Sequence, residues 1–265
     1  MLKNQATKED FSMLTKKRPE KRLLLGWLRQ RGRAANGRIT SGHKGGGAKK
    51  LYRLVDFGQG KMGVKAKVIA LEYDPFRTSF IALLEYEDGE KRYGLAAQGL
   101  KVGDSIICEA KGEILPGNRL KLKNIPVGTI VHNIEIEPGR GGKLVRGAGA
   151  SAQVLAQEDR FVNLKMPSGE VRKVLGECFT SIGAVSRGEH VYIKLGKAGA
   201  SRHWGRRPHV RGSAMSPPDH PHGGGNGKTS IGMPYSKTPW GKPAHGVKTR
   251  KRSWTNKYIL QRRTK

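Results

Sequence analysis

The chain has 265 residues with 51 Lys and Arg against 21 Asp and Glu, a formal net charge of +30, and only 36% of its residues are hydrophobic. Its longest apolar stretches, such as residues 80–84, are far shorter than the roughly 20 apolar residues that a membrane-spanning helix needs. Residues 2–15 also lack the apolar core of a signal peptide. We therefore expect no membrane partner and a location inside a cell or organelle.

The cysteine content argues against a fold stabilised by disulfide bonds or by zinc. Cys108 and Cys178 are the only two cysteines and lie far apart in the sequence. Two such residues form neither a disulfide framework nor a four-ligand zinc site. We expect both to be buried as small apolar side chains.

The positive charge is concentrated at the two ends of the chain. Residues 1–53 hold 15 basic and 3 acidic residues, residues 196–265 hold 16 and 1, and the middle holds 20 and 17. This excess indicates a polyanionic partner, either nucleic acid or an anionic lipid surface. The middle is long enough to bury a core, whereas the ends are expected to be disordered without a partner. The charge pattern thus predicts a nearly neutral body between two cationic arms.

The first arm contains one helical candidate and one glycine-rich loop. Residues 22–30 could place Leu23, Leu24, Trp27 and Leu28 on one helix face. The loop over residues 31–53 has six glycines, which allow close backbone approach to another molecule. We interpret it as a loop that follows phosphates rather than a flexible linker, because it carries the basic residues Arg31, Arg33, Arg38, His43, Lys44, Lys49, Lys50 and Arg53.

Strand patterns follow from residue 65 onward. Alternating and β-branched residues predict strands over 65–73, 79–86, 91–95 and 105–110, with Asp88-Gly89 as a hairpin turn. Short strands at this spacing, without a helix long enough for a crossover, predict a small antiparallel barrel of OB-like type.

A second set of strands predicts a second barrel of SH3-like size. Residues 118–127 are expected to connect the two halves. Strands are then predicted over 129–137, 152–156, 160–164, 170–175, 178–185 and 190–194, with the residues 130, 132, 134 and 136 on one face of the first of them. No Gly-rich strand-to-helix phosphate loop accompanies them, which argues against a nucleotide-driven enzyme.

The predicted fold class is all-β: an OB-like barrel followed by an SH3-like barrel, with long basic irregular extensions. We expect a basic N-terminal extension over 1–35, an OB-fold-like RNA-binding domain over 36–115, an SH3-like barrel domain over 116–195, and a basic Gly/His-rich C-terminal extension over 196–265.

One loop within the second barrel interrupts the strand pattern. Residues 138–151 place Arg140, Lys143 and Arg146 among five glycines and other small residues. The segment is either a surface hairpin with spare charge or, as we favour, a second loop whose backbone N–H groups and cations approach phosphates.

Residues 214–227, AMSPPDHPHGGGNG, admit three interpretations. A metal site would use His220, His222, Asp219 and either His203 or His209, but no metal-ligand spacing supports it. A catalytic His220 beside Asp219 is chemically possible, although no Ser or Cys nucleophile accompanies it. We favour the third, in which the histidines pack within nucleic acid and fix its backbone path.

Indoles between cations recur in the second arm. Trp204 and Trp240 are expected to stack on bases or ribose while neighbouring cations contact phosphates. The basic residues around them and in the terminal polycationic run are Arg202, His203, Arg206, Arg207, Lys242, Arg250, Lys251 and Arg252.

Three motifs in this order resemble the large ribosomal subunit protein two family. They are GRITSGHKGGGAKKLYRLVDF over 37–57, EPGRGGKLVRGAGASAQVLA over 137–156 and RGSAMSPPDHPHGGGNGK over 211–228, the last including Arg211 and Lys228 as further RNA-binding candidates. The resemblance runs over nearly the whole chain from about Arg31.

The resemblance implies a structural, non-enzymatic protein that binds large-subunit rRNA of the 23S type near the peptidyl-transferase region. It also implies contacts with small-subunit rRNA across the subunit interface and with neighbouring ribosomal proteins, and a role in subunit association and tRNA binding. His220 is the family histidine long discussed in peptide-bond formation, and we interpret it as support for the RNA. No cofactor, metal or homo-oligomer is expected.

The implied location is a ribosome, cytoplasmic by the bacterial type of the motifs, with a mitochondrial or plastid ribosome as the alternative. Two other function classes stay open at this stage: an enzyme using a metal or His220, and a chromatin-like DNA-binding protein.

Overall fold

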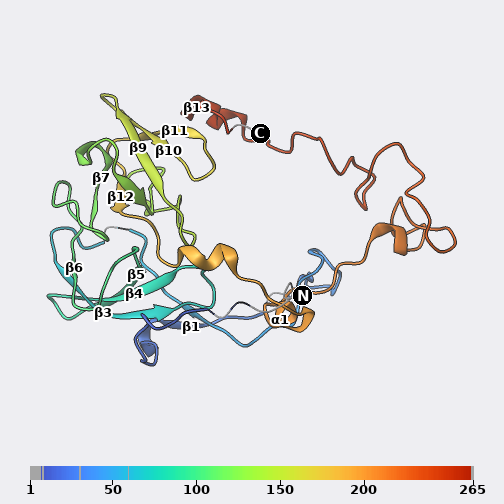
Figure 1. Ribbon diagram of the computed structural model, residues 1–265, viewed down its shortest axis with the longest axis horizontal. Helices are drawn as coiled ribbons and strands as arrows, with labels where there is room; N and C mark the ends of the chain where they lie inside the picture. Colours follow the sequence, from blue (N-terminus) through green and yellow to red (C-terminus); the bar gives the residue numbers. More distant parts are fainter. Residues whose placement is uncertain (1–6, 8, 30, 59, 264–265) are drawn as a thin grey trace. The chain divides into compact units, whose positions relative to one another are not determined.

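The computed structural model describes residues 7, 9–29, 31–58 and 60–263 (Figure 1). The chain divides into two compact units. We call the first, residues 1–28, 49–197 and 255–265, the barrel unit, and the second, residues 29–48 and 198–254, the arm unit. Among the described residues, no helix has the length and apolar character that crossing a membrane requires.

The first half of the barrel unit is a four-stranded antiparallel sheet with the order β5-β4-β3-β6. Its strands are β3 (Ala66–Tyr73), β4 (Phe80–Tyr86), β5 (Lys91–Leu95) and β6 (Ser105–Ile106). Val68 and Phe80 belong to a core cluster on one face, and the fully buried Tyr93 belongs to another. Three strands agree with the predicted ranges, whereas β6 is shorter than predicted.

The second half is a seven-stranded antiparallel sheet with the order β13-β11-β10-β9-β8-β12-β7. The strands are β7 (Arg119–Lys121), β8 (Ile130–His132), β9 (Ala152–Gln157), β10 (Phe161–Lys165), β11 (Val171–Leu175), β12 (Phe179–Ile182) and β13 (Ile259–Gln261). Aliphatic side chains such as Leu120, Val131 and Leu164 form its core. Together the two halves give the predicted all-β fold of OB-like and SH3-like type.

The strand predicted over 129–137 is wrong beyond His132. Asn133 has a left-handed φ of +49°, which ends β8 and breaks the alternation. Ile130 and Ile136 are exposed, while Glu135, assigned to the other face, is fully buried. Its carboxylate accepts the N–H groups of Gly141 at 2.9 Å and Phe179 at 3.0 Å. A backbone turn held by a buried carboxylate thus replaces the second half of the strand.

The helix predicted over 22–30 is also wrong. A 3₁₀ turn, η1 (Lys21–Leu23), leads into strand β1 (Leu24–Gly26), which pairs with β2 (Leu51–Arg53). A helix this short is marginal by itself, because the unpaired backbone groups at its two ends are many relative to its internal hydrogen bonds, whereas β2 pairs with the backbone of β1. Gln30 lies outside the described residues.

Three further elements differ from the prediction. Of the predicted strand over 190–194, residues 190–192 belong to a 3₁₀ helix, η3 (Gly188–Tyr192), and residues 193–194 to no regular element. The connection over 118–127 contains β7 and a 3₁₀ turn, η2 (Leu122–Asn124). Strand β13, drawn in dark red beside β11 in Figure 1, brings the last part of the basic arm onto the second sheet.

The arm unit consists mainly of loops. It contains the short helix α1 (Ala198–His203) and the 3₁₀ turn η4 (Gly212–Ala214), and the 3₁₀ helix η5 (Ser253–Tyr258) leads out of it towards β13. Isolated antiparallel bridges join Arg33 to Ile39 and Lys44 to Arg206. The second bridge shows that segments distant in sequence lie together within this unit.

Candidate nucleic-acid interface

A pocket of about 400 Å³ on the barrel unit combines aromatic rings with two arginines. Tyr52 comes from β2, Phe76 and Arg77 come from the β3–β4 connection, and Phe57 and Arg146 complete the ring of charged and aromatic groups. We call this the aromatic–arginine pocket. Aromatic faces stack on bases and guanidinium groups bind phosphates, so the pocket has both functions that an RNA site requires.

Arg77 is held in place from several sides. Its guanidinium forms an ion pair with the buried Asp74, donates to the Tyr52 hydroxyl at 3.0 Å, and lies 5.2 Å from the Tyr52 ring centre. The same group lies 5.3 Å from the ring of Phe57. Such fixation lowers the entropy cost of presenting the group to a ligand. Arg77 was missed by the sequence analysis, because one arginine between two strands carries no charge-cluster signal.

Of the three predicted cations in the 138–151 loop, only Arg146 lines this pocket. Its guanidinium lies 4.4 Å from the Phe57 ring centre and donates to the Gly142 carbonyl at 3.2 Å. Arg140 instead pairs with Glu137 at the surface, and the side chain of Lys143 is exposed. The loop therefore contributes one fixed arginine rather than three equivalent cations.

An aromatic cluster adjoins the pocket. The ring centres of Trp27 and Tyr52 are 5.1 Å apart, and those of Trp27 and Phe76 are 5.9 Å apart. Trp27 is 48% exposed, so much of its surface is open to a partner. The Lys50 ammonium lies 5.9 Å from the Phe76 ring and donates to the Pro75 carbonyl at 3.2 Å. Trp27 had been assigned to a helix face, and its pairing with Tyr52 follows from the β1–β2 register.

The other cations of the 31–53 loop divide between the two units. Arg53 is half-buried in β2 and donates to the Leu51 carbonyl at 2.8 Å, and Lys49, two residues before β2, is exposed. The remaining predicted residues of the loop, Arg31, Arg33, Arg38, His43 and Lys44, belong to the arm unit. The predicted loop is thus shared between the two units.

Within the arm unit, the 31–48 loop is bonded to residues 203–208. Gly45 N–H donates to Gly205 O, and Arg207 N–H donates to His43 O, both at 3.0 Å. Around these bonds lie further predicted site residues: Arg202, His203, Trp204 and Arg206, all exposed. The guanidinium of Arg206, which was expected to contact phosphates, lies 5.6 Å from the Trp204 ring.

His220 is buried within its own loop. Its Nδ1 accepts the His222 N–H at 3.0 Å, and its ring centre lies 4.7 Å from that of His222. A Cβ on Gly212 would meet the His220 ring at 2.5 Å, so glycine is required there. His222 Nε2 in turn accepts the Lys237 N–H at 2.9 Å. Both imidazoles are therefore used to hold the backbone of the 212–237 segment.

The metal and catalytic interpretations of this loop each require particular side chains to lie together. In the described part of the chain, no three His, Cys, Asp or Glu side chains are grouped so as to hold a metal ion. Nor does a hydrogen bond or ion pair among residues 9–29, 31–58 and 60–263 join the Asp219 carboxylate to His220.

The glycines of this loop lie against neighbouring residues of the same segment. A Cβ on Gly223 would meet Ser216 O at 2.3 Å, and one on Gly225 would meet the Thr229 hydroxyl at 2.3 Å. The remaining predicted cations and indole of the second arm are exposed: Arg211, Lys228, Trp240, Lys242, Arg250, Lys251 and Arg252. Trp240, with 83% of its surface exposed, is the most accessible of the four indoles.

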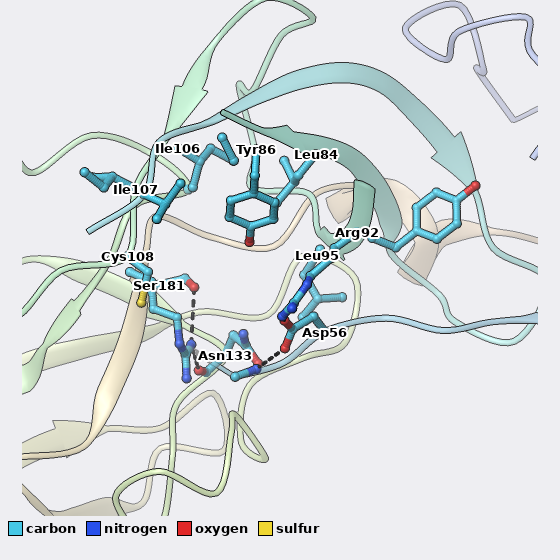
Figure 2. A pocket seen from close by; sticks show the side chains of 17 residues that line it. Asp56, Leu84, Tyr86, Arg92, Leu95, Ile106, Ile107, Cys108, Asn133 and Ser181 are labelled. Atoms are coloured by element: carbon cyan, nitrogen blue, oxygen red, sulfur yellow. Dashed lines mark hydrogen bonds and ion pairs between the residues drawn. The ribbon is translucent and has the colours of Figure 1, made fainter. Parts of the chain in front are cut away.

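A smaller cavity lies where the two halves of the barrel unit meet (Figure 2). Figure 2 shows Ile106, Tyr86 and Leu84 along one side and Asp56 and Asn133 along the other. Its volume of about 70 Å³ has room for water rather than for a nucleotide.

Neither thiol is suited to chemistry. Burial raises the pKa of the half-buried Cys108 to about 11 and that of the buried Cys178 to about 12. Both therefore stay protonated near neutral pH and are unreactive.

Two antiparallel sheets of OB-like and SH3-like type, an aromatic–arginine pocket and a cationic arm unit with one acidic residue, Asp219, define a nucleic-acid-binding protein. Residues 20–108 match the family model described as Ribosomal Proteins L2, RNA binding N-terminal domain, and residues 115–241 match Ribosomal Proteins L2, C-terminal domain. The chain belongs to the ribosomal protein L2 family. It is a structural rRNA-binding protein of the large ribosomal subunit, and its partners are rRNA and other proteins of that subunit.

Proposed function

We propose that this chain is a primary rRNA-binding protein that supports the peptidyl-transferase region, subunit association and tRNA binding. On the barrel unit, the main support for this proposal is the aromatic–arginine pocket, which fixes Arg77 and Arg146 beside the aromatic faces of Tyr52 and Phe57. The predicted cations of both units then follow the RNA backbone, with the sequence-independent, salt-sensitive affinity that phosphate contacts give.

Arg146→Gln tests this site directly, since none of the ion pairs among the described residues involves Arg146 and its loss leaves no buried charge behind. We expect weaker binding to a large-subunit rRNA fragment and a fall of about one in the slope of log affinity against log salt. Lys101→Gln, which removes an exposed cation away from the pocket, is the matched control. Equal losses in the two variants would show that the pocket is not the site.

We propose that His220 positions RNA and takes no part in the chemistry of peptide transfer. Support comes from its burial and from the use of its Nδ1 by the His222 N–H, which leaves no general base directed outward from that atom. His220→Gln should impair incorporation into large subunits. Normal incorporation with lost peptidyl-transferase activity would assign the residue a chemical role instead.

The contact with small-subunit rRNA is proposed from the exposed cations and indole of the second arm, such as Trp240, Lys242 and Arg250. Ultraviolet crosslinking of 70S-type particles should join this arm to small-subunit rRNA, and crosslinks confined to large-subunit rRNA would contradict it. We further propose the cytoplasmic ribosome as its location, which cell fractionation followed by sedimentation would distinguish from an organellar one.

A further inference from the structure

A cavity of about 520 Å³ within the arm unit is lined by five cations from two distant segments. Arg29, Arg31, Arg33 and Lys44 come from the first segment and Arg207 from the second. We call the segments 29–48 and 202–209 together the arm clasp. Ile39 and Pro208 provide apolar parts of the wall, and no carboxylate contributes to it.

The positive charge of this cavity is not neutralised within the described chain. None of the ion pairs formed by the described residues involves any of the five cations. Arg33 donates one guanidinium N–H to the Gly37 carbonyl at 2.7 Å, an uncharged acceptor. Asp219 is the single acidic residue of the arm unit and does not line the cavity. Like charges brought together in this way are costly unless an anion joins them.

The two segments meet through a continuous backbone contact. Besides the bonds at Gly45 and Arg207, Ala48 N–H donates to His203 O at 3.0 Å. Gly47, with a left-handed φ of +89°, lies so close that a Cβ would meet both N and Cα of Gly205 at 3.1 Å. The wall of the cavity therefore depends on both segments being present and on a residue without a side chain at this position.

A histidine pair closes the contact at one end. His43 Nδ1 is 3.0 Å from Pro208 O, and His209 Nδ1 is 2.6 Å from His43 Nε2. A carbonyl oxygen only accepts, so His43 Nδ1 carries a hydrogen. In the neutral ring its Nε2 then accepts, and His209 Nδ1 must donate. His43 itself has a left-handed φ of +59°, a conformation maintained by these contacts.

We propose that the arm clasp is a composite site for a cluster of closely spaced phosphate groups of the rRNA backbone. The inference rests on the proposed function, because it names the ligand chemistry of one of its surfaces. Five cations around one cavity exceed what a single phosphodiester neutralises, and the cavity is large enough for more than one phosphate group. Free polyphosphate has the same chemistry, so the experiment must separate the two sources.

The test uses the full chain and three single variants. Arg207→Gln removes a cation from the wall, Gly47→Ala separates the segments, and His209→Phe keeps a ring but removes the N–H donor. Arg207→Gln should weaken binding of a large-subunit rRNA fragment by roughly tenfold, as expected for loss of a charge-assisted contact. Gly47→Ala and His209→Phe should weaken it by a similar factor, because they move Arg207 away from the cations of residues 29–48. Arg207→Gln alone should also lower the salt slope by about one.

Two controls match these changes. Lys101→Gln removes an exposed cation that lies outside the arm unit, and Gly199→Ala, within it, adds a Cβ that meets no atom within 4 Å. Both should bind as the parent does. Circular dichroism and thermal unfolding of each variant would establish that the barrel unit is unchanged.

The outcomes separate the inference from the function on which it rests. If the parent chain fails to bind rRNA above the level of duplex DNA at physiological salt, the proposed function fails. If it binds but the three variants equal their controls, the composite site alone is overturned. Inorganic tripolyphosphate at millimolar concentration should compete only weakly with rRNA, and full displacement at micromolar concentration would assign the cavity to free polyphosphate.

Discussion

At the scale of single residues, buried polar groups decide where the second barrel departs from a simple strand pattern. Arg119 donates to Asn133 O at 2.9 Å, and its Nη2 lies 3.3 Å from Glu135 Oε1. Glu135 in turn binds two backbone N–H groups. A charged pair of this kind is costly to break from one side, because the remaining charge stays buried.

Glu135→Gln should therefore destabilise the chain strongly. The amide keeps the size of the side chain but leaves the Arg119 charge uncompensated, with an expected loss of about 3–5 kcal/mol in the free energy of unfolding. Urea denaturation followed by far-ultraviolet circular dichroism measures it. Glu177→Gln serves as the comparison, since that carboxylate pairs with Lys121 and Lys123 in solvent, and a similar loss there would contradict the argument.

His132 makes the stability of the barrel unit depend on pH. Burial lowers the pKa of its imidazole from 6.5 to about 4, while Nδ1 donates to the Gly183 carbonyl at 2.8 Å. Above pH 6.5 the ring is neutral in both states, so its full contribution to stability is present. As the pH falls from about 6.5 to about 4, the unfolded chain takes up a proton that the folded chain does not, and up to about 3 kcal/mol is lost.

Substitution of His132 isolates its contribution to the pH dependence of stability. In His132→Asn the amide nitrogen can replace the Nδ1 donor but does not titrate in this range. The difference in unfolding free energy between pH 7 and pH 4 should shrink by about the same amount, about 3 kcal/mol. An unchanged pH profile would assign the acid sensitivity to other groups.

At the scale of elements, the sequence predicted the longer strands, whose residue pattern is visible in the sequence. It missed the short strands, which form only by pairing with a distant segment. β3, β4, β9 and β11 have at least five residues each, enough for an apolar or alternating pattern to show, and lie close to where they were expected. β1, β7 and β13 have three residues each, too few for a period, and exist because a neighbouring strand binds them. Arg77 was missed for a similar reason: its partners lie in other segments of the chain.

The short strand β13 is expected to protect the edge of β11. It pairs at Val171↔Gln261 and Arg172↔Ile259, with an irregularity between them. Ile259→Pro removes a backbone donor and should expose amides of β11 to hydrogen exchange, while the β9–β10 pairing keeps its protection. Loss of protection throughout the sheet would instead mean that β13 is part of the cooperative core.

The loop around His220 depends on Gly212. In Gly212→Ala the new Cβ would occupy the position of the His220 ring, so the ring or the 212–214 turn must move. We expect normal stability of the barrel unit but reduced incorporation into large subunits, measured by sedimentation from cells that express both forms. Incorporation equal to that of the parent would show that the position of His220 is not needed for assembly.

At the scale of the whole molecule, the two units differ in their hydrophobic cores and in their balance of charged residues. The three hydrophobic core clusters all belong to the barrel unit. The arm unit has 16 basic residues against one acidic residue, and among the described residues it has one buried non-glycine side chain, His220. Stability therefore comes mainly from the barrels, and RNA contact is distributed over both units.

Limited proteolysis should reveal this division. Trypsin has many Lys and Arg targets in residues 210–252 of the free protein, where backbone bonds are few, and should cut there well before it cuts residues 66–182. Addition of large-subunit rRNA should slow the first cuts. Equal resistance of both regions in the free protein would show that the arm unit is stable without RNA.

The return of the chain to the barrel unit at β13 restricts the conformational freedom of the second arm. Residues 198–254 are joined to the barrel unit at both ends, through Lys197 on one side and through Thr255 and β13 on the other. They form a closed loop rather than a free tail. The conformational entropy of such a loop is reduced before any ligand arrives, and lengthening it costs only about 0.6 kcal/mol for each doubling. Assembly with RNA then starts from a restricted search volume, and a cut anywhere in the loop would enlarge that volume without removing a single contact.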